Sequence, residues 1–282
     1  MTRLLGIDGY NPRDFLAALG LMSLLPSACL HWDLNVPIID IDELPTKLLS
    51  ERIQELCRSP AFTLADNIRG PLELFADAAA SCRDISDPIV KSVALDLLAA
   101  YTDDPDRKDD GSLGDNSFHN ANGGSHMHQL AFARELAKSC DALSLDQALL
   151  SQNPGRWQVN PCRFRWSPDE FVPQAAAPQG PHCLVNGKYV PKTVPGLNLL
   201  AAIGLARLPK VTERKGNGRN VGMPDGRNFT WILWPSPLKA AEASCLLALP
   251  PQAALKRQWI IMSSERFNYA KGMYFGPAKR KS

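Results

Sequence analysis

Apolar residues in the first half of the chain recur mainly with the spacing of α-helices. Asn11 and Pro12 favour the start of a helix, and Pro26 favours its end. The apolar residues between them would cover most of the circumference of this helix. This helix is therefore predicted to be deeply buried. Shorter runs predict strands at Leu4–Ile7 and Val36–Ile41. The spacing predicts further helices at about 44–58, 71–82, 87–101 and 125–139, and a short one after Ser144.

The second half is richer in proline, tryptophan and arginine. Strands are predicted at Arg163–Trp166, Asn228–Trp234 and Trp259–Met262, and a compact apolar helix over Gly196–Leu208. Basic and aromatic residues alternate in the first of these strands, so both arginines would share one face. The proline- and glycine-rich stretch 173–196 is predicted to be irregular.

Charge is distributed unevenly along the 282 residues. Residues 1–150 hold 12 Lys and Arg against 23 Asp and Glu, a formal charge of −11, and residues 151–282 hold 19 against 6, a charge of +13. Such a chain favours an anionic partner for its basic half, or two halves that attract each other. We therefore expect an α+β protein, with an acidic, mainly helical domain over 1–150 and a basic, mixed α/β, nucleic-acid-binding part over 151–282.

Two seven-residue segments match at almost every position. Phe15–Leu21 reads FLAALGL and Leu199–Leu205 reads LLAAIGL, and a proline follows each within a few residues. Their alanines and glycines suit close helix packing. The match is compatible with an internal duplication and also with chance.

Basic residues alternate with aromatic residues in three segments of the second half. The glycine-rich stretch Arg207–Trp234 is the longest basic segment and is compatible with a phosphate-contacting loop or with a solvated hairpin. For each aromatic residue taken alone, burial in the core is the favoured interpretation. For the basic residues together we favour contact with a nucleic-acid backbone. The candidate binding residues are Arg163, Arg165, Lys210, Arg214, Lys215, Arg219, Arg227, Arg266, Lys271, Lys279, Arg280 and Lys281.

Candidate catalytic residues are few. His119, His126 and His128 form a weak candidate metal site, which would make the chain a metal-dependent nuclease, but they match no recognised ligand spacing. The glycines do not form a dinucleotide-binding turn, and no phosphate-binding loop is present, so no cofactor is expected. The seven cysteines include no CxxC pair, which favours free thiols in a reducing cytoplasm. No apolar run reaches the roughly 20 residues of a membrane span.

Four motifs together resemble a known family. Asn11–Leu21 (NPRDFLAALGL), Arg165–Glu170 (RWSPDE), Pro195–Leu205 (PGLNLLAAIGL) and Trp234–Leu238 (WPSPL) are similar, in this order, to motifs of CRISPR-associated proteins of subtype I-G, formerly I-U. The family form of the second motif is RWDP-like, and Ser167 stands here in place of its aspartate.

The resemblance implies a non-catalytic subunit of a crRNA-guided DNA surveillance complex (Cascade), most similar to its large subunit. Such a subunit would bind crRNA or target DNA and read the motif that flanks the target. Its other partners would be Cascade subunits, facing the acidic half, and a recruited helicase-nuclease. A small or backbone subunit and a protein-interaction scaffold remain the alternatives.

Overall fold

The structure is a computed structural model that combines helices with small antiparallel sheets, and it confirms the α+β class. Among the residues that it describes, no helix has the length and apolar character to cross a membrane. The described residues are 1–64, 72–103, 114–115, 133, 136–152, 158–159, 166–168, 182–185, 188–208, 210–212, 218–220, 222–223, 227–249, 251–269 and 272–281.

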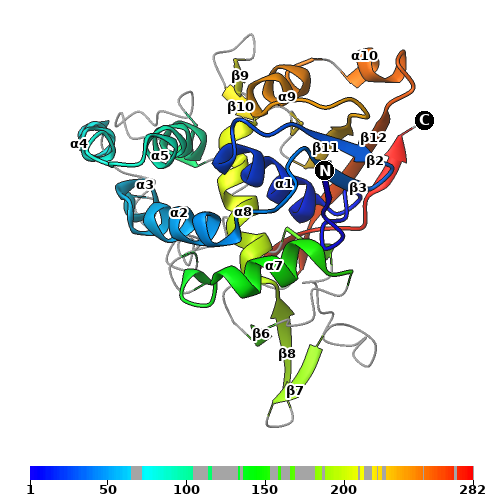
Figure 1. The fold of residues 1–282 in the computed structure, drawn as a ribbon. Helices are drawn as coiled ribbons and strands as arrows, with labels where there is room; N and C mark the ends of the chain where they lie inside the picture. Colours follow the sequence, from blue (N-terminus) through cyan, green and yellow to red (C-terminus); the bar gives the residue numbers. More distant parts are fainter. Residues whose placement is uncertain are drawn as a thin grey trace.

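Helices α1 (Pro12–Leu24) and α8 (Pro195–Gly204) form the centre of the molecule (Figure 1). The Asn11 side chain caps α1 by accepting a 3.0 Å hydrogen bond from the Arg13 backbone N–H, as its sequence position predicts. Every residue of α1 and of α8 is buried. The predicted deep burial of the first helix is confirmed.

The two matched segments meet at their glycines. A Cβ atom on Gly20 would lie 1.9 Å from the Leu200 carbonyl oxygen, and one on Gly204 would lie 1.9 Å from the Leu16 carbonyl oxygen. Leu16 and Leu200 occupy equivalent positions in the two segments, as do Gly20 and Gly204. The contact is therefore reciprocal, and only glycine fits at either crossing position. The glycines that the two segments share are thus required for the close packing of α1 against α8.

Described helices of the first half pack around this pair, most of them on its left in the view of Figure 1 and the last of them below it. They are α2 (Thr46–Arg58), α3 (Pro60–Leu64), α4 (Leu72–Cys82), α5 (Pro88–Tyr101) and α7 (Ala142–Leu150). The predicted helices at 44–58, 71–82 and 87–101 are confirmed, and α3 was not predicted. Helix α7 begins before Ser144, because the Asp141 carboxylate accepts a 2.7 Å hydrogen bond from the Ser144 N–H. Most of the predicted helix 125–139 lies outside the described residues.

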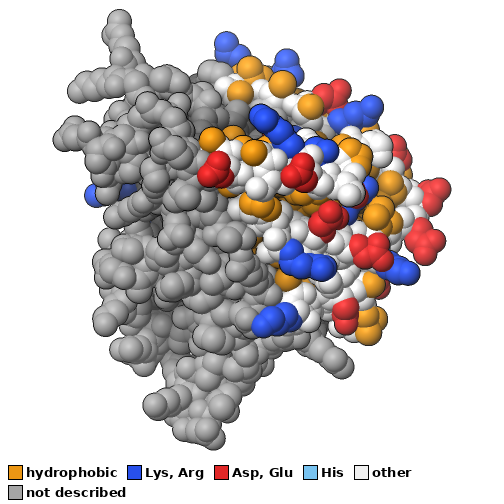
Figure 2. All heavy atoms as spheres, turned by 90° about the vertical axis from the view of Figure 1, so that its left-hand side faces the viewer, with side chains coloured by type: hydrophobic (Ala, Val, Ile, Leu, Met, Phe, Trp, Pro, Cys, Tyr) orange, Lys and Arg blue, Asp and Glu red, His pale blue; other side chains and the backbone are white. Residues whose placement is uncertain are grey.

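Basic and acidic side chains are interspersed on the described part of the face that Figure 2 shows. Two arginines are paired with acidic residues of α5 and its N-terminal cap. Arg52 lies 2.9 Å from Asp87, and Arg207, from the basic half, lies 3.1 Å from Asp96 in the acidic half. Part of the acidic charge is thus balanced within the chain.

A three-stranded sheet forms at the N-terminus from β1 (Thr2–Arg3), β2 (Leu30–Asp33) and β3 (Val36–Ile39), in the order β1-β3-β2. The strand predicted at Val36–Ile41 is confirmed, but the one predicted at Leu4–Ile7 is wrong. The chain leaves the sheet there because the Gly6 N–H donates a 2.9 Å hydrogen bond to the Leu149 carbonyl, at the end of α7. Leu4 and Ile7 are buried as part of the core.

A second small sheet contradicts the predicted irregular stretch 173–196. Strands β6 (Gln158–Val159), β7 (His182–Val185) and β8 (Lys188–Thr193) pair in the order β6-β8-β7. Residues of high β-propensity (Val185, Tyr189 and Val190) outweigh the prolines and glycines around them. Two short pairs, β4 (Thr102–Asp103) with β5 (Gly114–Asp115) and β9 (Lys210–Thr212) with β10 (Gly218–Asn220), complete the smaller strands.

The C-terminal sheet is built on β12 (Ile260–Tyr269). It pairs with β11 (Asn228–Leu233), with β13 (Gly272–Phe275) and with β14 (Lys279–Lys281), always antiparallel. The strands predicted from Asn228 and at Trp259–Met262 are confirmed. Helices α9 (Ala240–Leu247) and α10 (Pro251–Leu255) connect β11 to β12.

One face of this sheet packs on α1. The Phe15 ring lies 5.8 Å from the Trp231 ring and 6.1 Å from the Phe229 ring, measured between centroids, and the Trp231 Nε1–H donates a 2.8 Å hydrogen bond to the Gly9 carbonyl. These side chains belong to a single hydrophobic core with residues from both halves of the chain. The boundary near residue 150 stays a prediction based on composition and charge.

Candidate functional site

The two faces of the C-terminal sheet differ in chemistry because side chains alternate along each strand. On β11 and β12, Phe229, Trp231 and Met262 are buried on the inner face, toward α1. The residues between them point to the opposite side. We call this side the outer face, and its polar members are Asn228, Thr230, Ser263, Glu265, Lys279 and Lys281.

The register of β14 places its two lysines on the outer face. Lys279 pairs with Ser263, and Lys281 pairs with Ile261. Arg280 pairs with Met262, so the alternation directs its side chain to the other side. All three residues of β14 are exposed. Two cations therefore stand two positions apart on one exposed edge strand.

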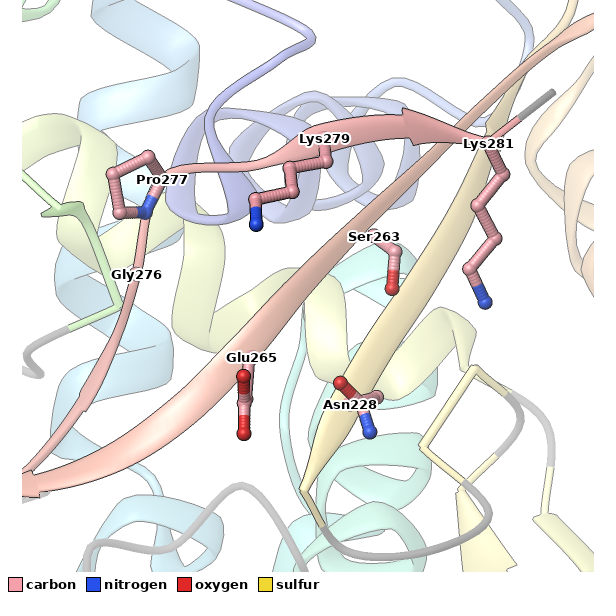
Figure 3. A pocket seen from close by; sticks show the side chains of 7 residues that line it. All are labelled: Asn228, Ser263, Glu265, Gly276, Pro277, Lys279 and Lys281. Carbon is pink, nitrogen blue, oxygen red and sulfur yellow. The ribbon is translucent and has the colours of Figure 1, made fainter.

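A hollow of about 470 Å³ opens on the outer face, lined by Asn228, Ser263, Glu265, Gly276, Pro277, Lys279 and Lys281. Figure 3 shows that these residues come from three neighbouring strands and from the turn before β14. Its lining combines two ammonium groups with amide and hydroxyl donors. Glu265 contributes one negative charge, so the charged residues of the hollow carry a formal net charge of +1.

Hydrogen bonds connect the outer-face side chains across the strands. The hydroxyls of Thr230 and Ser263 lie 3.2 Å apart, and the Lys281 Nζ donates a 3.4 Å hydrogen bond to the Thr230 Oγ1. The lysine contact is long and exposed, so it leaves the ammonium group available to an anion. Lysine is a point charge with three donors, which suits a phosphate oxygen without fixing its geometry.

Other predicted binding residues lie elsewhere. Lys210 and Arg219 belong to the β9–β10 hairpin, where Arg219 pairs with Val211. Arg227 is exposed immediately before β11. Arg163, Arg165, Arg214, Lys215 and Lys271 lie outside the described residues, as do the candidate metal ligands His119, His126 and His128. Within the described ranges, no three His, Cys, Asp or Glu side chains are grouped as metal ligands.

Arg266 is a predicted binding residue that the fold buries on the inner face. Its side chain is 8% exposed, and its guanidinium carbon lies 5.7 Å from the centroid of the Phe275 ring. Burial lowers the pKa of Arg266 to about 10. Little of this side chain is therefore left for a phosphate contact.

A buried polar cluster joins two of the motifs that carry the family resemblance. The Asn11 Nδ2 donates a 2.9 Å hydrogen bond to the Ser167 Oγ, and the Arg13 guanidinium lies 2.8 Å from the Asp14 carboxylate. Burial raises the pKa of Asp14 to about 6, against the opposing effect of the Arg13 charge. Because the cluster is enclosed, its described contacts are structural: it fixes the start of α1 against the Trp166–Ser167 segment.

Sequence reasoning missed the neutral members of the outer face. Asn228, Thr230 and Ser263 have no charge or motif to mark them, and only the pairing of β11 with β12 brings them together. The alternation of polar and apolar residues in Asn228–Leu233 was the available signal.

Comparison of the chain with protein-family models, with curated proteins and with solved structures finds no match. A function for the outer face must therefore be inferred from its residues and from the resemblance of the motifs.

Proposed function

We propose that the chain is a non-catalytic nucleic-acid-binding subunit of a crRNA-guided antiviral complex. In this proposal the outer face of the C-terminal sheet contacts the phosphate backbone of crRNA or target DNA. The observation that carries it is the placement of Lys279 and Lys281 on one exposed face beside the hollow lined by Asn228 and Ser263. The motif resemblance supplies the class of complex.

The chemistry of the outer face suits a phosphate backbone. Residues two positions apart on a strand are separated by about 6.8 Å, so each lysine is able to neutralise its own phosphate. Hydroxyl and amide groups donate further hydrogen bonds to phosphate or sugar oxygens, contacts that position a nucleic acid without reading its bases. Glu265 at the same hollow would repel a phosphate placed directly over it, which favours a path along β14.

The proposal predicts that reversing both lysine charges weakens binding and flattens its salt dependence. Each phosphate contact contributes about −0.7 to −0.9 to the slope of log K against log salt concentration. Lys279→Glu with Lys281→Glu should therefore reduce the magnitude of that slope by about 1.4 to 1.8. Fluorescence anisotropy of a labelled single-stranded oligonucleotide, titrated at several salt concentrations, measures it.

A matched control changes the net charge equally on a different part of the surface. Lys47 and Arg58 are exposed on α2, away from the C-terminal sheet (Figure 1), and Lys47→Glu with Arg58→Glu also changes the charge by −4. This variant should keep most of the wild-type slope. Equal slopes for the two double variants would contradict the proposal, as would an absence of binding by the wild-type chain at physiological salt.

A further inference from the structure

An aromatic residue continues the outer face beyond β12. Trp259 directly precedes the strand and lies just outside its paired register. It packs on a small apolar cluster formed by Ile232, Ala254 and Ile261, yet remains partly exposed. The outer face therefore has an apolar, aromatic end and a polar, basic end.

Arg257 lies on this tryptophan. Its guanidinium carbon is 5.2 Å from the centroid of the Trp259 ring, and the arginine itself is exposed. An arginine in this position has one side toward the ring and the other toward solvent. The planar guanidinium of Arg257 thus packs on the Trp259 indole and leaves one side accessible to a ligand.

The turn between α10 and β12 holds the two residues together. The backbone N–H groups of Arg257 and Trp259 both donate to the Ala254 carbonyl, at 3.0 and 3.2 Å. The intervening Gln258 has a φ of +56°, in the left-handed region that residues other than glycine rarely adopt. Such backbone is strained and persists where the surrounding structure enforces it.

The arginine–tryptophan pair is continuous with the lysines. Lys281 pairs with Ile261, and Trp259 packs on the apolar cluster that contains Ile261. The outer face therefore presents, in order, a planar stacking group, one lysine and a second lysine. Unpaired bases stack on aromatic rings and on arginine planes, whereas the bases of a duplex are already stacked on one another.

We infer that the outer face selects single-stranded nucleic acid, with one unpaired base stacked on the Arg257–Trp259 pair and the adjoining phosphates on Lys281 and Lys279. This inference rests on the proposed function and adds a substrate class to it. The lysines supply the salt-dependent part of the affinity. The stacked base supplies a part that does not depend on salt.

The first arm of the test uses the unmodified chain. Anisotropy titrations compare a labelled oligodeoxythymidylate with an abasic strand of equal length and with a duplex of equal length. One stacked base contributes about 1–3 kcal/mol, so the oligodeoxythymidylate should bind at least about 5-fold more tightly than the abasic strand, whose phosphates are the same. It should also bind more tightly than the duplex.

The second arm uses Arg257→Lys, which keeps the charge and removes the plane. Because Arg257 is exposed, this variant should fold normally. It should lose most of the preference for the strand with bases while keeping the wild-type salt slope. Trp259→Leu, which keeps an apolar contact with Ile261, should give the same loss.

The outcomes separate this inference from the proposed function. Equal binding of the abasic strand, of the duplex and of oligodeoxythymidylate would overturn the single-strand inference. An unchanged base preference in Arg257→Lys would overturn it as well. Neither result tests the proposed function. The salt slope of the Lys279→Glu, Lys281→Glu variant still decides whether the outer face contacts phosphate.

Discussion

The same strands form the inner and outer faces of the C-terminal sheet, because neighbouring residues of each strand point to opposite faces. The inner face buries Phe229 and Trp231 against α1, and Arg266 beneath Phe275. The outer face leaves Lys279 and Lys281 exposed around a hollow. Basic and aromatic residues that are close in sequence can therefore lie in the core or at the surface. Closeness in sequence alone does not place them in one binding site.

The largest predicted effect separates two neighbours on β11. Trp231→Ala should lower the free energy of unfolding by about 3–5 kcal/mol, because it removes a fully buried indole and its hydrogen bond to Gly9. Thr230→Ala, one residue away on the outer face, should lower it by about 1 kcal/mol or less. Chemical denaturation followed by circular dichroism measures both values. Equal losses would mean that the outer face is as essential to folding as the inner one.

A smaller effect should distinguish the buried charge of Asp14 from the exposed charges of the outer face. Burial raises the folded-state pKa of Asp14 from 3.8 to about 6, so the folded state binds more protons than the unfolded state between these values. The stability contributed by protonated Asp14 is fully present below pH 3.8 and is lost as the pH rises through about 6. The loss is on the order of 2–3 kcal/mol.

Asp14→Asn isolates this contribution, because the amide stays neutral over the whole range. The unfolding free energy of the wild-type chain should fall by about 2–3 kcal/mol relative to that of the variant between pH 4 and pH 6.5, measured by denaturant titration at each pH. A difference that stays constant over this range would show that Asp14 ionises normally in the folded protein.

Local sequence signals identified most of the helices and the main strands. Helix α1 was predictable because Asn11, Pro12 and Pro26 mark its ends, and the strand at Asn228 because its residues alternate. Errors arose where contacts distant in sequence decide the backbone. The hydrogen bond from Gly6 to Leu149 diverts the chain from the predicted first strand, and strand pairing orders part of the stretch 173–196.

The candidate site was only partly predictable for the same reason. Composition marked Lys279, Arg280 and Lys281 as basic, but only the register of β14 on β12 separates the two lysines from the arginine. The burial of Arg266 likewise depends on Phe275, which comes from the next strand. Arg257 and Trp259 were not recognised as a pair, because the turn at Gln258 that joins them leaves no pattern in the sequence.

The most direct test of the outer face is lysine footprinting of the unmodified chain. The chain is acetylated under limiting reagent, with and without a saturating single-stranded oligonucleotide, and the modified lysines are quantified by mass spectrometry. Lys279 and Lys281 should react several-fold more slowly in the complex, while exposed Lys47 on α2 should react equally in both samples. Unchanged reactivity of Lys279 and Lys281 at saturation would contradict the assignment of nucleic-acid binding to the outer face.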